Sequence, residues 1–176
     1  MDREKIEERY KWDLSKIYSS IDDFRSDMQL VKDKMNDFSK YKDITYDENT
    51  LYEVISLYME TSRILNKLEV YTSLLSDEDT GINKNRELKE EVSNLSSELI
   101  SKTYFIEPNI LKIDYSLIEK YYEKNDKLLE YKRYLYKLYR YKEHMLSDSE
   151  EKLLANLSKV FGNNYETYEL MKDSDM

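Results

Sequence analysis

The chain has 176 residues, a net charge of −9, no cysteine, 2 glycines and 1 proline. Without cysteine it cannot form disulfides, a thiol nucleophile or a cysteine-ligated zinc site, and its negative charge argues against general affinity for nucleic acid or anionic membranes. No apolar run approaches the roughly 20 residues that a membrane helix needs, and the charged start lacks the apolar core of a secretory signal. We therefore expect a cytoplasmic protein that binds neither nucleic acid nor membrane, and the scarcity of glycine and proline favours long helices.

Residues 1–46 predict an opening segment followed by one helix. Trp12, the only tryptophan, is expected to anchor the opening segment in the core, because tryptophan is highly buried on average. Ser20 stands before Asp22 and Asp23, the pattern of a helix start with acids in the first turn. Apolar residues then recur every three or four positions, which predicts an amphipathic helix carrying Phe24, Met28, Val31, Met35 and Phe38.

Residues 47–106 predict a long helical hairpin. Asp47 can cap the first arm, whose stripe is Leu51, Val54, Tyr58, Thr61, Leu65, Leu68, Thr72 and Leu75. A polar turn over residues 76–81, containing Gly81, leads to a second stripe of Leu88, Val92, Leu95, Leu99, Thr103 and Ile106. The acids of the turn do not form a calcium loop, because counting from Asp77 places Gly81 at position five and Leu88 where glutamate is required.

Residues 107–176 predict further short helices. Pro108 disfavours helix at Glu107 and marks the end of the second arm. Asp114 and Asn125 can start two helices, the first carrying Leu117, Ile118, Tyr121 and Tyr122 and the second Leu128, Tyr131, Leu135, Leu138 and then Met145. Residues 147–150 match a capping box before a helix whose face is Leu153, Leu154, Leu157, Val160 and Phe161, and which ends at Gly162. The predicted fold is all-α, a single helical domain built on the antiparallel hairpin.

The residues offer no catalytic constellation. His144 is the only histidine, whereas a helix-borne zinc peptidase site needs two histidines one turn apart and a glutamate base. His144 therefore reads as a structural residue near a helix end. We expect no catalytic residue, no cofactor-binding residue and no metal ligand in this chain.

One segment departs from the acidic average. Residues 132–142 contain four tyrosines, no acid and five cations, which are Lys132, Arg133, Lys137, Arg140 and Lys142. Such a strip can contact a partner, a peptide carboxylate or single-stranded nucleic acid. Alternatively, the long cationic side chains cover tyrosine faces and pair with acidic neighbours, as on an ordinary solvated helix.

Several segments, taken in order, resemble oligoendopeptidase F. Residues 10–14, Tyr-Lys-Trp-Asp-Leu, look like that family's opening, and residues 75–80 resemble the turn between its first long helices. Residues 105–111 are similar to the segment after its hairpin. The strongest match runs over residues 131–147 and continues through residues 150–155, and residues 165–171 also fit. The resemblance covers nearly the whole chain.

The resemblance implies an expected function. The family are intracellular zinc metallo-oligopeptidases that cut short peptides inside a largely helical channel, and their zinc-binding His-Glu-x-x-His helix lies in a C-terminal catalytic domain. Residues 1–176 would then be the N-terminal, non-catalytic helical domain, which walls the channel and contacts the catalytic domain of the same polypeptide. The zinc and the cleavage of oligopeptide substrates would belong to that catalytic domain, absent from this chain. A free-standing helical interaction module and a nucleic-acid binder using residues 132–142 are the alternatives.

Overall fold

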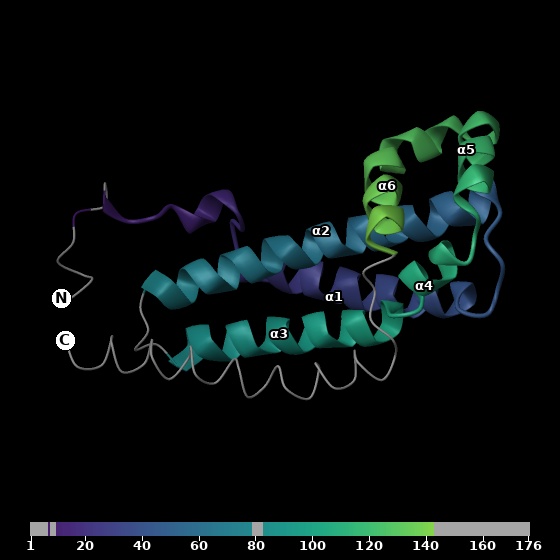
Figure 1. Ribbon diagram of the computed structural model, residues 1–176. Coiled ribbons are helices and arrows are strands. Elements are labelled where there is room, and N and C mark those ends of the chain that lie inside the picture. The colour runs from purple at the N-terminus through teal and green to yellow at the C-terminus, as the bar shows by residue number, and fades with distance from the viewer. Residues whose placement is uncertain (1–6, 8–9, 79–82, 143–176) are drawn as a thin grey trace. The chain divides into compact units, whose positions relative to one another are not determined.

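The computed structural model describes residue 7 and residues 10–78 and 83–142, and every regular element within them is helical (Figure 1). The α-helices are α1 (Ile21–Asp37), α2 (Glu48–Glu78), α3 (Asn83–Thr103), α4 (Ile106–Leu111), α5 (Tyr115–Lys124) and α6 (Lys132–Tyr141). Short 3-10 segments are η3 (Leu14–Lys16), η4 (Phe38–Tyr41) and η5 (Asp126–Tyr131). The predicted all-α fold is confirmed.

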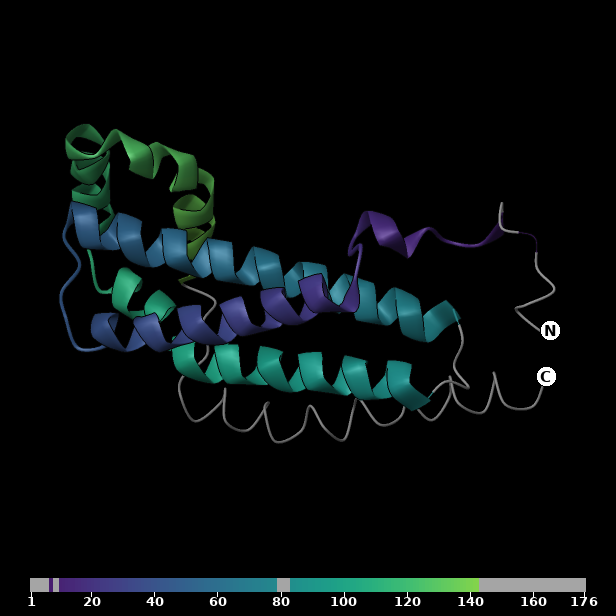
Figure 2. The same cartoon turned by 180° about the vertical axis from the view of Figure 1, so that it is seen from behind.

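The chain divides into two compact units, Met1–Leu135 and Tyr136–Met176. In the first unit α1, α2 and α3 lie side by side, with α2 antiparallel to both of its neighbours (Figures 1 and 2). Segments α5 and η5 pack against α2. The second unit is described only over residues 136–142, which contain the end of α6. The domain boundaries expected from the sequence stay a prediction.

Helix α1 begins and packs as its sequence predicts. Ser20 is its N-cap, where the hydroxyl oxygen accepts a hydrogen bond from the Asp23 N–H at 3.1 Å. The whole predicted stripe is buried, namely Phe24, Met28, Val31, Met35 and, in η4, Phe38. This face packs against α2 and α3.

Helices α2 and α3 form the predicted hairpin. The Asp47 carboxylate caps α2 by accepting from the Thr50 N–H at 2.8 Å. Both apolar stripes face inward, although Tyr58 and Leu75 are only half-buried. Residues 76–78, expected in the turn, instead form the last turn of α2, because their backbone groups continue the helix. Residues 79–82, including Gly81, lie outside the described residues.

Buried threonines of α2 and α3 satisfy their own hydroxyls. Thr61, Thr72 and Thr103 donate to the backbone carbonyls of Leu57, Leu68 and Leu99, each four residues earlier in the same helix. Near the turn, Asn85 Nδ2 of α3 donates to the Leu75 carbonyl of α2 at 2.9 Å. The burial of these polar residues therefore leaves no unpaired hydroxyl at these three positions.

The expectation that Pro108 disfavours helix at Glu107 is wrong, because Glu107 is helical. Helix α3 does end nearby, at Thr103, but α4 begins at Ile106 and contains both Glu107 and Pro108. Pro108 is the third residue of α4, where a backbone N–H would have no partner within the helix. Proline is therefore tolerated at the start of this helix.

The expectation that Trp12 lies in the core is also wrong. Trp12 is 55% exposed, whereas Tyr18 is 4% exposed. The Tyr18 ring meets Phe24 and Tyr71 edge-on at centroid distances of 5.5 and 5.1 Å, and its hydroxyl donates to Asp27 Oδ2 at 2.8 Å. Tyr18 takes the anchoring position because its ring is buried while its hydroxyl keeps a polar partner.

The segments after α4 begin at the capping residues that the sequence predicts. Asp114 accepts from the Ser116 N–H at the start of α5, and Asn125 accepts from the Lys127 N–H at the start of η5. The helix expected to start at Asn125 and reach Met145 is divided, over the described residues, into η5 and α6, and Met145 lies outside those residues. The buried apolar positions include Ile118, Tyr121, Leu128, Leu135 and Leu138, while Leu117 is exposed. His144, the capping box at residues 147–150, and the helix expected over residues 153–162 lie outside the described residues.

Candidate functional site

The basic strip lies on α6 and on Lys142, the residue after it, and its cations are exposed. Lys132, Arg133, Lys137, Arg140 and Lys142 are all exposed. Tyr136 and Tyr141, 56% and 60% exposed, stand between them. At helical spacing, residues 132, 136 and 140 form one row and residues 133, 137 and 141 the row beside it. The strip is therefore a cationic and aromatic surface, as either sequence interpretation requires.

One cation of the strip already covers a tyrosine. Lys132 Nζ lies 5.8 Å from the ring centroid of Tyr122, a distance at which a cation is attracted to the ring. This contact matches the structural interpretation at Lys132. For the other cations of the strip, both interpretations stay open.

The opposite side of α6 is held by a polar contact. The Tyr134 hydroxyl donates to Glu107 Oε1 at 3.2 Å, and Leu135 beside it is fully buried. Burial, followed by the nearby Glu107 carboxylate, raises the pKa of Tyr134 well above its ordinary value. Tyr134 therefore remains a protonated donor at neutral pH, and it positions the start of α6 against α4.

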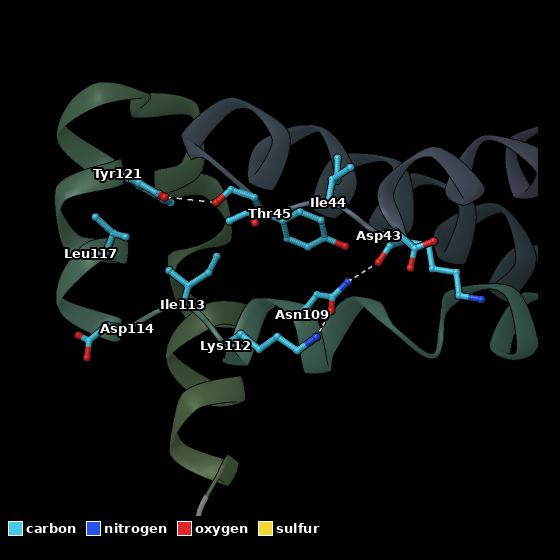
Figure 3. A pocket seen from close by; sticks show the side chains of 11 residues that line it. Asp43, Ile44, Thr45, Asn109, Lys112, Ile113, Asp114, Leu117 and Tyr121 are labelled. Carbon is cyan, nitrogen blue, oxygen red and sulfur yellow. Dashed lines mark hydrogen bonds between the residues drawn. The ribbon is translucent and has the colours of Figure 1, made fainter.

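A groove of about 520 Å³ opens among the η4–α2 loop, α4 and α5 (Figure 3). Asn109 connects its walls, because Nδ2 donates to the Lys42 carbonyl at 2.9 Å and Oδ1 accepts from Lys112 Nζ at 2.7 Å. Across the groove, the Tyr121 hydroxyl donates to the Tyr46 carbonyl at 3.2 Å. These contacts join segments far apart in the sequence into one surface.

The chemistry of this groove suits recognition. Ile44 and Leu117 expose apolar surface, and Asp43 and Asp114 supply carboxylates on its wall. Burial is the largest cause that raises the pKa of Tyr121, so its phenol is a neutral hydrogen-bond donor at physiological pH. Because this donor is already used on a backbone carbonyl, the groove offers shape and polar contacts but no activated nucleophile.

The sequence did not reveal this groove. Asn109 and Lys42 are 67 residues apart, and Tyr121 and Tyr46 are 75 residues apart. Periodicity within one helix carries no information about such pairs. The available signal was the polar residue Asn109 directly after the only proline, at the end of the predicted hairpin.

The described residues do not fit a zinc ion. Over residues 10–78 and 83–142, no three histidine, cysteine, aspartate or glutamate side chains cluster as a metal site would require. No helix in the same part of the chain has the length and apolar character needed to cross a membrane. His144, the one candidate nitrogen ligand, falls beyond these residues.

Fold and site together define an all-helical domain built on a hairpin, with a polar groove and an exposed cationic segment among the described residues. A family model described as Oligopeptidase F matches residues 109–176. The chain is 28% identical over 175 residues to Group B oligopeptidase PepB of Streptococcus agalactiae, covering 99% of the chain and 29% of that protein. It is likewise 28% identical to oligopeptidase PepF of Bacillus subtilis, covering 99% of the chain and 26% of that protein.

The solved structures agree at the level of the fold. The crystal structure of oligoendopeptidase-F from Enterococcus faecium superposes with a TM-score of 0.75 at 23% identity, over 88% of this chain and 30% of that one. The chain thus resembles the N-terminal domain of oligoendopeptidase F, as its sequence motifs indicate. It spans 26–30% of the length of these relatives.

Proposed function

We propose that this chain is the non-catalytic helical domain of a zinc-dependent oligopeptidase, and that it walls and gates the substrate channel. The observation that carries the proposal is the similarity over 99% of the chain to proteins named as oligopeptidases. Those proteins are more than three times as long, which leaves ample room for a separate catalytic domain in the same polypeptide.

The packing of the three long helices supports the proposed role as a wall of the substrate channel. Helices α1, α2 and α3 pack along their lengths through a continuous apolar core, so they form a rigid layer. Grooves and exposed tyrosines lie on the outside of the described helices, where a peptide could meet both apolar surface and hydrogen-bond donors. A rigid layer with such a surface excludes bulky substrates without taking part in bond cleavage.

Zinc belongs to the proposal only through the catalytic domain. Peptide hydrolysis by a zinc enzyme needs an ordered metal, a water activated by it and a general base in one enclosed site. The described residues do not supply such a set, so the bound metal and all of the bond chemistry are assigned to the rest of the polypeptide. Its substrates would be oligopeptides and its location the cytoplasm.

The test compares the complete gene product with a version lacking residues 1–176. Hydrolysis rates are measured on a short peptide and on an unfolded protein, and the 176-residue chain is then added back separately. Gating predicts that the deletion weakens cleavage of the short peptide or removes the bias against the long substrate, and that adding the chain back restores it. A Leu65→Ala chain, destabilised in its core, is the control and restores less.

Unchanged rates together with unchanged length selectivity would rule the gating role out. Cleavage of peptides by the purified 176-residue chain alone, in a metal-dependent manner, would contradict the non-catalytic assignment. Binding of the chain to an unrelated protein, with no effect on the catalytic remainder, would favour the free-standing interaction module.

A further inference from the structure

A second, smaller groove of about 340 Å³ lies where the end of α1 and η4 meet the C-terminal end of α3. Its floor is apolar, formed by Met35 and Phe105, which are 1% and 7% exposed. None of the described residues that line it is acidic. This is unusual in a chain with 37 aspartates and glutamates against 28 lysines and arginines.

Two lysines line the groove, and both are held by neighbours. Lys102 Nζ lies 3.2 Å from Asn36 Oδ1 and 3.1 Å from Glu98 Oε1. Lys42 Nζ lies 5.7 Å from the ring centroid of Tyr104. Contacts of this kind reduce the freedom of the two ammonium groups before any ligand arrives, which lowers the entropy cost of binding.

The charges around the groove favour a ligand with a single negative charge. Lys42 and Lys102 bring two positive charges, and Glu98, paired with Lys102, removes one of them. The remaining single positive charge suits a monoanion. A ligand with several phosphates would instead be repelled by the acidic protein around the groove.

The rim of the groove offers a place for an apolar group beside the anion. Tyr104 is 63% exposed, and its ring meets Phe105 edge-on at a centroid distance of 5.9 Å. An exposed aromatic ring beside a cation offers apolar contact area for a side chain of a ligand whose anionic group meets that cation. Ser39, whose hydroxyl donates to the Asn36 carbonyl at 3.0 Å, adds a polar oxygen to the same wall.

We propose that this groove binds the free carboxylate of a short peptide, with the neighbouring side chain of the peptide lying on Tyr104. The inference rests on the proposed function, in which peptides approach this domain. It assigns Lys42 and Lys102 to carboxylate binding and Tyr104 to the side-chain contact. The groove volume lies at the lower end of the range for ligand sites, so it holds the end of a peptide and not a long segment.

The experiment is a titration of the isotopically labelled 176-residue chain, followed by nuclear magnetic resonance. The probe is the tripeptide Ala-Ala-Phe with a free C-terminal carboxylate, compared with its C-terminal amide. The carboxylate form should shift the backbone signals of Ser39, of Tyr104 and of Ser101, which also lines the groove, in a saturable manner. The dissociation constant should be on the order of millimolar for so small a ligand. The amide should bind at least about threefold more weakly, since it lacks the charge.

Three variants and one matched control test the assignment. Lys42→Gln and Lys102→Gln should each weaken binding at least about threefold, as should Tyr104→Ala. Lys89 is an exposed lysine on α3 that does not line the groove, so Lys89→Gln should leave the binding of the tripeptide unchanged. Circular dichroism of each variant establishes that it is folded.

Two further probes distinguish the source of the carboxylate and the class of ligand. The amidated tripeptide Ala-Glu-Ala, acetylated at its N-terminus, carries its carboxylate on a side chain, and equal binding would extend the site to acidic peptides in general. Adenosine monophosphate binding more tightly than either peptide would overturn the peptide assignment. Equal binding of amide and carboxylate, or variants that change nothing, would overturn the site itself.

Failure of this inference is separate from failure of the proposed function. If the tripeptide does not bind while deletion of residues 1–176 still changes length selectivity, the groove assignment is wrong and gating stands. If the tripeptide binds while the deletion changes neither rate nor selectivity, the gating role is wrong.

Discussion

The hydroxyl of Tyr134, at the start of α6, donates to the carboxylate of Glu107 in α4, 27 residues earlier in the chain. Together with the fully buried Leu135, this bond holds the first turn of α6 against α4. Removing the hydroxyl in Tyr134→Phe should lower the free energy of unfolding by about 0.5–1.5 kcal/mol, the usual net value of such a bond. Urea unfolding measures it, and Tyr136→Phe, at a 56% exposed position, is the control expected to change little. Equal stability of Tyr134→Phe and the unmodified chain would contradict the positioning role.

The core faces of α2 and α6 are set by Leu65 and Leu135, which are 5% and 0% exposed. Replacing either with alanine should cost about 2–5 kcal/mol, because the lost side chain leaves a cavity that neighbours only partly fill. Ile100→Ala on α3, at a 67% exposed position, should stay within about 0.5 kcal/mol of the unmodified chain. Chemical denaturation of the three variants gives the comparison. A cost below about 0.5 kcal/mol for Leu65→Ala would show that Leu65 does not lie on the core face of α2.

The cap of α2 gives a pH-dependent prediction at the acid end. Hydrogen bonding from the Thr50 N–H is the main cause that lowers the pKa of Asp47. The folded state therefore stabilises the charged carboxylate, a contribution present above the ordinary pKa of 3.8 and lost as the pH falls. Asp47→Ala should cost about 0.5–2 kcal/mol at neutral pH, whereas Asp47→Asn should retain most of the cap. Urea unfolding of the unmodified chain and of Asp47→Asn, followed from about pH 6 down to about pH 3, should show the stability advantage of the unmodified chain shrinking as Asp47 is protonated, and a constant difference would contradict this.

Tyrosine burial gives the matching prediction at the alkaline end. Burial, followed by Tyr115 and Glu119, raises the pKa of Tyr122 to about 12 from the ordinary value of 10.0. The folded state holds this proton more tightly than the unfolded chain, so stability is unaffected below pH 10.0 and falls as the pH rises towards 12. Thermal unfolding across this range measures the fall. In Tyr122→Phe the stability should fall less steeply with rising pH. The same dependence on pH in this variant and in the unmodified chain would show that Tyr122 does not cause the loss of stability.

We expect no stoichiometric zinc in this chain. The chain has one histidine and no cysteine, the residue types that supply most protein ligands of zinc, and among the described residues no group of three or more histidines, cysteines, aspartates or glutamates could hold a metal. Metal analysis after dialysis provides the measurement. One zinc per chain that disappears in His144→Ala would show that the histidine is a ligand after all.

Helices α1, α2, α3 and α5 could be predicted from the sequence because each is encoded locally. The stripe of α1 and the two stripes of the hairpin repeat every three or four residues, and Ser20, Asp47 and Asp114 stand where their side chains reach a free backbone N–H. Trp12 was misplaced because average burial describes a residue type and not its neighbours, and Tyr18 already fills the site between Phe24 and Tyr71.

The candidate sites were less accessible to prediction. The cations on α6 could be found because they follow one another along one segment, and their exposure agrees with the pattern. Both grooves instead arise where distant segments meet, as when Lys102 reaches Asn36 across 66 positions. A single sequence carries no periodic signal for such encounters, so their residues become visible only once the helices are packed.

The buried threonines of the hairpin have a consequence for how its two arms are aligned. Since Thr61, Thr72 and Thr103 each donate within their own helix, these hydroxyls do not tie one arm to the other. Along these positions the alignment of α2 with α3 depends on the fit of side-chain shapes, and the bond from Asn85 to the Leu75 carbonyl fixes it near the turn. Exchange of a threonine for valine, which has nearly the same outline, would preserve that alignment, whereas a bulkier leucine would push the arms apart and shift their mutual register.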